Sequence, residues 1–241
     1  MSLKLENVSY IYEKGTSQET AAIKNVDLEI NKGEFVAIIG HTGSGKSTLI
    51  QHFNGLEKPT EGKVLYDGKD IFDKDFDLRK LRCKVGLVFQ YPEHQLFEAT
   101  VLKDVCFGPK NEGLSNEDAW IRAKEALKLV GIGEEMYEKS PFEMSGGQKR
   151  RVAIAGTLAM NPEILVLDEP AAGLDPETKC DIFEILQKIR KQRNAAIVLV
   201  SHHMEDVAQF ANRVWVMYNG KIVMDDTPEE VYKRVEELEE M

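Results

Sequence analysis

The segment FVAIIGHTGSGKST, residues 35–48, decides the fold. Its first six residues are an apolar run that ends in glycine, which is typical of a short strand buried inside a parallel sheet. The following residues match the pattern G-x-x-x-x-G-K-[ST], placed after a strand and before a helix as that pattern requires. Strand, glycine loop and helix in this order predict an α/β fold with a nucleotide site.

The glycine loop predicts how that nucleotide is held. Glycine lets the backbone curl so that successive N–H groups point at phosphate oxygens. We expect Lys46 to reach the β- and γ-phosphates and Ser47 to bind Mg²⁺. A glycine-rich turn without a ligand is the alternative, and the flanking strand and helix disfavour it. The predicted nucleotide-binding residues of the loop are Gly40, His41, Thr42, Gly43, Ser44, Gly45, Lys46, Ser47 and Thr48.

A second apolar strand carries two acidic residues at its carboxyl end. The run ILVL at 164–167 delivers Asp168 and Glu169 to the edge where ligands bind in open α/β sheets. Asp168 is expected to orient Mg²⁺ through water, and Glu169 is the candidate general base for attack on the γ-phosphate. Two acidic residues after a strand are a weak signal alone, and the phosphate loop in the same chain strengthens it.

The segment PFEMSGGQKRR, residues 141–151, is typical of a helix N-terminus that binds an anion, and it would be the second in this chain. Three basic residues fall in the first turns of the predicted helix. The helix is expected to begin with Ser145, Gly146, Gly147 and Gln148. Such a stretch also marks many ordinary junctions between a loop and a helix. Because the loop at 40–48 already wraps its own phosphates, a second phosphate site makes sense for a nucleotide held by another chain, as in a two-fold head-to-tail dimer.

The composition excludes several other classes. The chain has 241 residues, 42% of them hydrophobic and 30% charged, which suits a globular protein with a substantial core. A formal net charge of −10 disfavours wide binding to nucleic acid. No apolar run approaches the roughly 20 residues that cross a bilayer, and no signal-peptide pattern is present. Cys83, Cys106 and Cys180 are scattered, which predicts reduced thiols in a cytoplasmic protein.

Strand and helix patterns alternate around the parallel core. The predicted strands and hairpins are 3–12, 21–30, 64–70 with a turn at Asp67-Gly68, and 214–226 with an Asn-Gly turn. Asp175 and Pro176 are expected to start one helix. Ser115 and Asp118 are expected to cap another, whose buried stripe is predicted to contain Trp120, Ala123, Leu127 and Val130.

We predict a single domain over residues 1–241. Its nucleotide-binding core comprises 1–90 and 161–226, and it contains an N-terminal antiparallel β subdomain. Residues 91–160 form an inserted helical subdomain, and 227–241 form a C-terminal acidic helix that opens at Thr227-Pro228.

The motifs GHTGSGKST, MSGGQKRR and ILVLDEP, in this order and spacing, resemble the ATP-binding subunit of an ABC transporter, and the resemblance covers essentially the whole chain. It implies a P-loop NTPase core with a mostly parallel sheet, an N-terminal antiparallel β subdomain and an inserted α-helical subdomain. It also implies that two such subunits enclose two ATP molecules with Mg²⁺. Residues 145–148 of one subunit would then cap the γ-phosphate of the ATP bound by the other.

The resemblance to ABC transporter ATPases implies functional roles for four further residues. Tyr12 matches the aromatic residue that stacks on adenine, although it also suits an ordinary strand. Gln90 matches the glutamine that senses Mg²⁺ or water and links the core to the helical subdomain. Asp175 matches an aspartate that acts across the dimer, and it can also be a plain N-cap. His202 matches the histidine that contacts the γ-phosphate, with His203 adjacent to it.

The stretch FQYPEHQLFEATVLKDVCFGP, residues 89–109, resembles the energy-coupling factor (ECF) ATPases. These subunits power the uptake of vitamins or of cobalt and nickel ions. The implied partners are a second ATPase subunit, identical or paralogous, an integral membrane coupling subunit and a substrate-binding membrane subunit, with no nucleic acid. The implied location is the cytoplasmic face of the cell membrane. Met144 and Ala171 depart from the usual family residues, and we expect the first change to be tolerated.

Two other functions remain as alternatives at this point. A soluble ABC ATPase that acts in translation or DNA repair usually has two ATPase cores or long coiled-coil insertions, which 241 residues do not accommodate. A P-loop kinase or GTPase would not need residues 145–148 or His202, and no guanine-specifying Asn-Lys-x-Asp stretch is present. The transporter hypothesis predicts that residues 91–99, which mix aromatic and apolar groups, contact a membrane partner. A loop that packs only on its own subdomain is the alternative.

Overall fold

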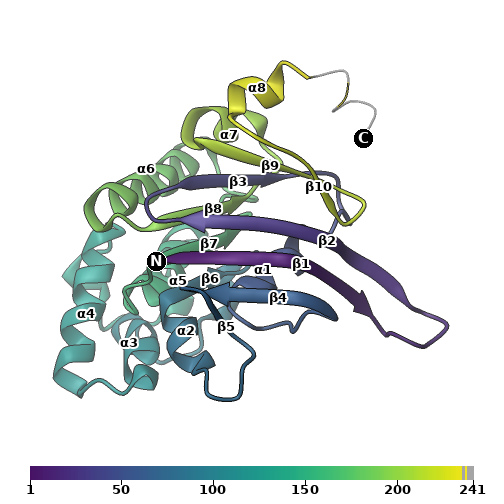
Figure 1. The fold of residues 1–241 in the computed structure, drawn as a ribbon. Helices are drawn as coiled ribbons and strands as arrows, with labels where there is room; N and C mark the ends of the chain where they lie inside the picture. Colours follow the sequence, from purple (N-terminus) through teal and green to yellow (C-terminus); the bar gives the residue numbers. More distant parts are fainter. Residues whose placement is uncertain (235–236, 238–241) are drawn as a thin grey trace. The chain divides into compact units, whose positions relative to one another are not determined.

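The structure is a computed structural model that describes residues 1–234 and 237 (Figure 1). The chain forms two compact units, each described by itself below. The first unit comprises residues 1–81 and 196–241, and the second unit comprises residues 82–195. Helix α2 (Leu78–Lys84) contains the first of the two boundaries.

The first unit contains an antiparallel sheet and a mostly parallel one. The antiparallel sheet has the order β2-β1-β4-β5, formed by β1 (Ser2–Tyr12), β2 (Thr20–Asn31), β4 (Glu61–Tyr66) and β5 (Lys69–Asp70). In the other sheet, β3 (Phe35–Ile39) lies parallel to both β8 (Ala196–Val200) and β9 (Arg213–Tyr218), and β10 (Lys221–Asp226) is antiparallel to β9. The helices of this unit are α1 (Lys46–Phe53), α7 (Met204–Phe210) and α8 (Pro228–Tyr232).

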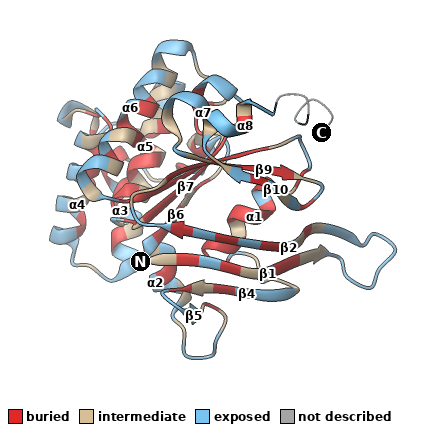
Figure 2. Ribbon diagram, turned by 45° about the horizontal axis from the view of Figure 1, so that its top comes forward, coloured by how far each residue is buried: buried red, intermediate tan, exposed pale blue. Residues whose placement is uncertain are grey.

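Burial follows from the residue pattern of these strands. Every residue of β3 and β8 is buried, as expected for short apolar strands inside a parallel sheet. Along β2 buried and exposed residues alternate from Val26 onward, because successive side chains point to opposite faces (Figure 2). Val207 of α7 and Val231 of α8 pack with residues of β3, β9 and β10 in one apolar cluster. Burial and apolar packing therefore fix the position of β3, the strand that precedes the glycine loop.

The second unit contains a pair of parallel strands and most of the helices. Strand β6 (Val85–Val88) pairs with β7 (Ile164–Asp168) in parallel. Its helices are α3 (Val101–Glu112), α4 (Asn116–Leu129), α5 (Gly146–Leu158) and α6 (Pro176–Arg193), with short 3-10 turns η1 (Pro92–Gln95), η2 (Glu134–Met136) and η3 (Pro141–Glu143). Helix α4 packs against both α3 and α5. This unit thus carries both predicted acidic residues and the second predicted phosphate-facing helix end.

Turns and caps lie where the sequence predicts them. The hairpin turns at Asp67-Gly68 and Asn219-Gly220 have positive φ at both residues, as a two-residue type I′ turn requires. Asp175 accepts from the Thr178 N–H at the start of α6, and Pro176 is the first helical residue. Helix α8 begins after its cap Thr227. Residues 235–236 and 238–241 of the predicted acidic helix lie outside the described residues.

The predicted buried stripe of α4 is wrong at one position. Trp120 is 47% exposed, whereas Ala119, Ala123 and Leu127 are fully buried. The stripe therefore begins one residue earlier, which rotates the buried face by about 100° at that end. Alanine at positions 119 and 123 lets α4 approach its neighbouring helices closely, and there is no room for an indole ring on that face.

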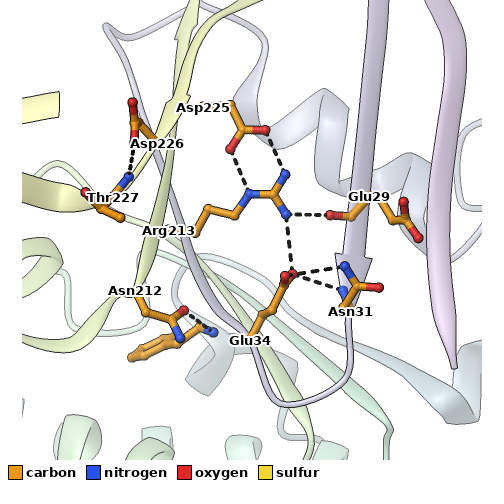
Figure 3. Close-up of polar contacts among 9 residues, drawn as sticks. Glu29, Asn31, Glu34, Asn212, Arg213, Asp225, Asp226 and Thr227 are labelled. Atoms are coloured by element: carbon orange, nitrogen blue, oxygen red, sulfur yellow. Dashed lines mark hydrogen bonds and ion pairs between the residues drawn. The ribbon is translucent and has the colours of Figure 1, made fainter. Parts of the chain in front are cut away.

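A polar network fastens the β9–β10 hairpin to the end of β2 (Figure 3). The guanidinium of Arg213 donates two hydrogen bonds of 2.7 Å to the carboxylate of Asp225 on β10. It also donates to the Glu29 carbonyl oxygen at 2.9 Å and to Glu34 at 3.5 Å. These bonds to Asp225, and then the nearby negative charges, raise the pKa of Arg213. The network therefore connects three strands of the unit that carries the glycine loop.

Arg213→Met is expected to lower the free energy of unfolding by about 1–3 kcal/mol, because it leaves two carboxylates without their cation. Urea unfolding followed by circular dichroism measures this change. Arg79→Met, at an exposed position of the same unit, is the matched control and is expected to stay within about 0.5 kcal/mol of wild type. Equal midpoints for the two variants would show that the network adds nothing to stability.

Candidate functional site

The glycine loop between β3 and α1 adopts a backbone that only glycine accommodates. Gly40, Gly43 and Gly45 have φ values of 147°, 82° and 107°, in the region that L side chains rarely adopt. A Cβ at Gly40 would overlap the carbonyl oxygen of Met217, and one at Gly45 would overlap that of Ala22. Glycine is thus required at these positions both for conformation and for close approach of the backbone.

The polar groups of this loop fit a phosphate ligand. The Lys46 ammonium donates to the carbonyl oxygens of Gly40 at 2.7 Å and His41 at 2.8 Å, which holds the cation against the loop. The Ser44 hydroxyl is buried and makes no hydrogen bond to any described residue. A buried hydroxyl without a partner is uncommon in folded proteins. It is accounted for if a ligand rich in oxygen, such as a triphosphate, accepts its hydrogen bond.

Tyr12 lies beside the helix that follows the loop. Its phenol shares a 3.0 Å hydrogen bond with the Thr48 hydroxyl of α1, and its side chain is 39% exposed. The ring of Tyr10 stands edge-on to it at 4.8 Å. Tyr10 is fixed in turn by donating to Glu57 at 2.6 Å, and this bond, with burial, raises the pKa of Tyr10 to about 12. An exposed aromatic face is therefore held close to the phosphate loop.

His202 lines the same cavity as the start of the glycine loop. This cavity has a volume of about 250 Å³, and Gly40, His41 and His202 are among its lining residues. His203 is not among them; its N–H donates to Ser201, and it precedes helix α7 as the N-cap residue. The structure thus brings His202, rather than its neighbour, toward the loop.

In the second unit, Gln90 and Glu169 meet at the ends of β6 and β7. The Gln90 amide donates to the Glu169 carboxylate at 3.0 Å, and the buried Asp168 precedes Glu169 at the end of β7. Glu169 has φ 47°, an unusual left-handed conformation for a residue of its type. Such strained backbone is concentrated at functional sites. The predicted general base is therefore held by a hydrogen bond in a strained position.

Residues 145–148 form a complete capping box at the start of α5. The Ser145 hydroxyl accepts from the Gln148 N–H at 3.3 Å, and the Gln148 side chain accepts from the Ser145 N–H at 3.0 Å. A Cβ at Gly146 would meet nothing within 4 Å, so the helix end is open there. The first N–H groups of a helix have no partner within it, and they carry its positive end. This exposed end suits an anion.

The two glycines of this segment differ in their surroundings. A Cβ at Gly147 would lie 2.7 Å from the Thr178 Cγ2 of α6. Thr178 is itself tied to Asp175, whose carboxylate accepts from the Thr178 N–H at 3.0 Å and from its hydroxyl at 2.7 Å. These hydrogen bonds lower the pKa of Asp175. Asp175 therefore acts as the N-cap of α6 and places that helix against Gly147.

The three basic residues at 149–151 do not all face an anion as the sequence suggests. Arg150 is only 2% exposed, and its guanidinium makes paired hydrogen bonds of 2.7 and 3.0 Å to Glu93 of η1. Helical spacing could have placed Arg150 on the buried face of α5, because the buried Ile154 and Leu158 follow it by four and eight residues, but it could not have identified Glu93 as its partner.

The predicted site residues fall into two sets. The glycine loop, Tyr12 and His202 belong to the first unit. Gln90, Asp168, Glu169, Asp175 and residues 145–148 belong to the second unit. In the first unit Tyr12 contacts Thr48, and His202 shares a cavity with Gly40. In the second unit Gln90 contacts Glu169.

Comparison with known proteins establishes the family. Residues 23–172 match the family model described as ABC transporter. The chain belongs to the ABC transporter family. It is 55% identical over its whole length to the energy-coupling factor transporter ATP-binding protein EcfA2 of Caldanaerobacter subterraneus subsp. tengcongensis, of which it covers 84%. It is also 55% identical to the EcfA2 protein of Clostridium tetani, over 99% of this chain and 83% of that protein.

Solved structures agree with this assignment. The chain resembles cbiO1 from Clostridium perfringens, part of the ABC transporter complex cbiONQ, with a TM-score of 0.85 and 40% identity over 99% of this chain and 93% of that one. It also resembles the bacterial ABC transporter cassette MJ0796, with a TM-score of 0.83 and 36% identity. That match covers 94% of this chain and 98% of MJ0796. These matches confirm the predicted ABC ATPase fold, the ECF ATPase assignment and the expected ATPase activity. They give no support to the alternative of a soluble, non-transport ATPase.

None of the helices within residues 1–234 and 237 is both long enough and apolar enough to cross a membrane.

Gly147→Ala is expected to lower the free energy of unfolding by about 1–3 kcal/mol, because the added methyl group overlaps Thr178. Thr178→Ser removes the overlapping methyl group and keeps the hydroxyl bonded to Asp175, so the double variant is expected to regain most of the loss. Gly146→Ala is the control, since its methyl group meets nothing within 4 Å. Urea unfolding measures all three; a Gly147→Ala protein as stable as Gly146→Ala would contradict the packing described here.

The Glu93–Arg150 pair is expected to stabilise the fold in a pH-dependent way. Burial raises the pKa of Glu93, the Arg150 hydrogen bonds and charge lower it, and the net shift is downward from 4.5. A carboxylate with a lowered folded-state pKa contributes stability above its unfolded pKa and loses it as the pH falls through the folded pKa. The stability difference between wild type and Glu93→Gln should therefore be constant from neutral pH down to about 5 and shrink below about 4.5. Urea midpoints across that range measure it, and a difference that grows in acid would reverse the assigned sign.

Proposed function

We propose that this chain is the ATP-hydrolysing subunit of an ECF-type importer, and that it works as a head-to-tail dimer around two ATP molecules. The observation that carries the proposal is the presence of two phosphate-facing helix ends in one chain, at Lys46 after the glycine loop and at Gly146 after Ser145. One serves the ATP bound by its own subunit. The other serves the ATP bound by the second subunit, which is identical or paralogous.

The nucleotide is assigned to the first unit. The backbone N–H groups of residues 40–48 and the Lys46 ammonium hold the phosphates, and Tyr12 stacks on adenine. His202 contacts the γ-phosphate from across the shared cavity. Ser47 is the Mg²⁺ ligand that we propose in this unit, and Gln90 and Asp168 are the residues proposed to interact with Mg²⁺ in the second unit. Oxygen ligands suit this ion, which neutralises phosphate charge when bound.

Hydrolysis is assigned to the Gln90–Glu169 pair. Glu169 takes a proton from the water that attacks the γ-phosphate, and the hydrogen bond from Gln90 orients its carboxylate. Ser145 and the open N–H end at Gly146 stabilise the γ-phosphate of the opposite subunit. Asp175 places α6 beside that end and acts across the dimer. ATP binding closes the dimer, and hydrolysis reopens it.

Two solved relatives support a dimer and a membrane complex. The cassette MJ0796 has been solved as a dimer, including a post-hydrolysis state bound to ADP and Pi. The protein cbiO1 is part of the ABC transporter complex cbiONQ. We assign this chain, by analogy, to the cytoplasmic face of the cell membrane with a membrane coupling subunit and a membrane subunit that binds a vitamin or a transition-metal ion.

The contact with the membrane partner is assigned to the segment after Gln90. Phe97 is 57% exposed, and its ring stands edge-on to Phe107 of α3 at 4.9 Å. Tyr91 in the same stretch is also exposed. Exposed aromatic groups in a cluster mark interaction sites. We retain 1–90 and 161–226 as the core and 91–160 as the helical subdomain that passes the closing motion to the membrane.

Two substitutions separate binding from hydrolysis. Lys46→Ala is expected to abolish ATP binding, because the phosphates lose their cation. Glu169→Gln is expected to bind ATP normally, to lower kcat by about 100-fold or more, and to remain as an ATP-bound dimer. ATP binding is measured with a fluorescent analogue, turnover by phosphate release, and dimerisation by light scattering.

Lys24→Ala, a change outside the site, is the control and should leave all three readouts unchanged. Normal turnover by Glu169→Gln would exclude this residue as the base. Full turnover by a monomer, independent of protein concentration and unaffected by Ser145→Ala, would exclude a shared site.

A further inference from the structure

Arg150 is a buried cation with a specific set of partners. It lies in the second turn of α5, and its side chain is 2% exposed. Its Nε and Nη2 atoms donate to the two carboxylate oxygens of Glu93 at 3.0 and 2.7 Å. Its Nη1 atom donates to the carbonyl oxygens of Pro170 at 3.0 Å and Ala172 at 2.7 Å. Tyr91 places its ring near the guanidinium, 5.7 Å from centroid to Cζ.

Packing alone does not explain an arginine at this position. Burying a charged group is unfavourable unless it is paired and hydrogen-bonded, and an apolar residue of similar volume often gives a fold that is as stable or more so. Arginine presents five N–H donors in a planar fork, whereas lysine offers three from a single nitrogen. Only the fork can bind a carboxylate with two parallel bonds and still reach two carbonyl oxygens on another side. The hydrogen-bond geometry of the guanidinium therefore explains arginine at this position better than apolar packing does.

The partners of Arg150 come from two segments that each follow a catalytic candidate. Glu93 lies three residues after Gln90, and Pro170 and Ala172 lie one and three residues after Glu169. Gln90 and Glu169 are themselves joined by the 3.0 Å hydrogen bond described above. Arg150 is carried by the helix that begins at Ser145. One guanidinium thus ties this helix to both segments, and every one of these contacts lies within the second unit.

We propose that Arg150 is a positioning residue, which sets the placement of the Gln90–Glu169 pair relative to the helix end at residues 145–148. The inference rests on the proposed function, because it assumes that Glu169 is the base and that residues 145–148 face the opposite ATP. Through the guanidinium, the position of α5 is coupled to the segments that follow Gln90 and Glu169.

The kinetic test compares Arg150→Lys and Arg150→Met with Arg151→Lys and Arg151→Met. Arg151 is the matched control: it lies next in α5, and its ion pair is with Asp181 of α6 at 3.9 Å instead of with either segment. Arg150→Met is expected to lower kcat by about 100-fold, since misplacing a catalytic group by about 1 Å has effects of that size. Arg150→Lys should lower it by about tenfold, and KM for ATP should change less than about twofold in both. The Arg151 variants should keep kcat within about twofold of wild type.

A second measurement does not depend on catalysis. Amide hydrogen exchange reports local opening, and it should become faster in residues 91–95 and also in residues 170–174 of Arg150→Lys. Glu93→Gln keeps the carbonyl bonds, so its exchange should rise in residues 91–95 alone. Arg151→Lys should change neither segment. All variants are purified as the whole chain and assayed well below their melting temperatures.

The two measurements together separate the possible outcomes. Faster exchange in both segments with a loss of kcat at constant KM supports the proposal. Exchange no faster than in Arg151→Lys, or a kcat no lower than in that control, overturns it, since Arg150 would then have a role in folding only. A wild-type chain without ATPase activity would contradict the proposed function, whereas the exchange pattern would still decide whether Arg150 ties the two segments.

Discussion

A helix cannot satisfy its own first N–H groups, and both halves of the proposed nucleotide site use this constraint. Before α1, glycine at three positions of the loop allows the positive φ values there, and at Gly40 and Gly45 it also allows close approach to the backbone of Met217 and Ala22. At α5 the capping box satisfies part of the helix end and leaves Gly146 open. A helix end attracts an anion through its backbone N–H groups, so neither helix end depends on the titration of a side chain to do so.

The two helix ends lie in different units, and each unit is built to fix its own half. In the first, burial of β3 and β8 and the Arg213 network, which reaches Glu34 just before β3, fix the strand that precedes the glycine loop. In the second, Arg150 and the Gln90–Glu169 bond join the ends of β6 and β7 to α5. The predicted groups are therefore divided between the two units, with the glycine loop in the first and Glu169 and residues 145–148 in the second.

Features that depend on local interactions could be predicted from the sequence. The turns at Asp67-Gly68 and Asn219-Gly220 follow from the positive φ that their geometry requires, and the caps Ser115 and Asp175 follow from bonds to the next turn of helix. The glycines of the phosphate loop are of the same kind. The family, and with it the expected activity, followed from the order of three such motifs and is confirmed by the comparisons.

Features that depend on distant partners could not be predicted in this way. Trp120 fits an amphipathic pattern as well as Ala119 does, and only the small space beside α3 and α5 selects the alanine. Arg150 looks like one of three exposed cations until Glu93, 57 residues away, is seen beside it. A periodic pattern identifies the buried face of a helix, but it does not tell which polar residue on that face has found a partner elsewhere.

At Glu169 the backbone conformation favours a short side chain, whereas the hydrogen bond to Gln90 is made by a long one. Glycine, asparagine and aspartate occupy such a conformation most easily, so the main chain at this position prefers a short side chain or none. The amide of Gln90 is reached by a carboxylate one methylene longer than that of aspartate. Glutamate at this position has an unfavourable backbone conformation, and its longer side chain makes the hydrogen bond to Gln90.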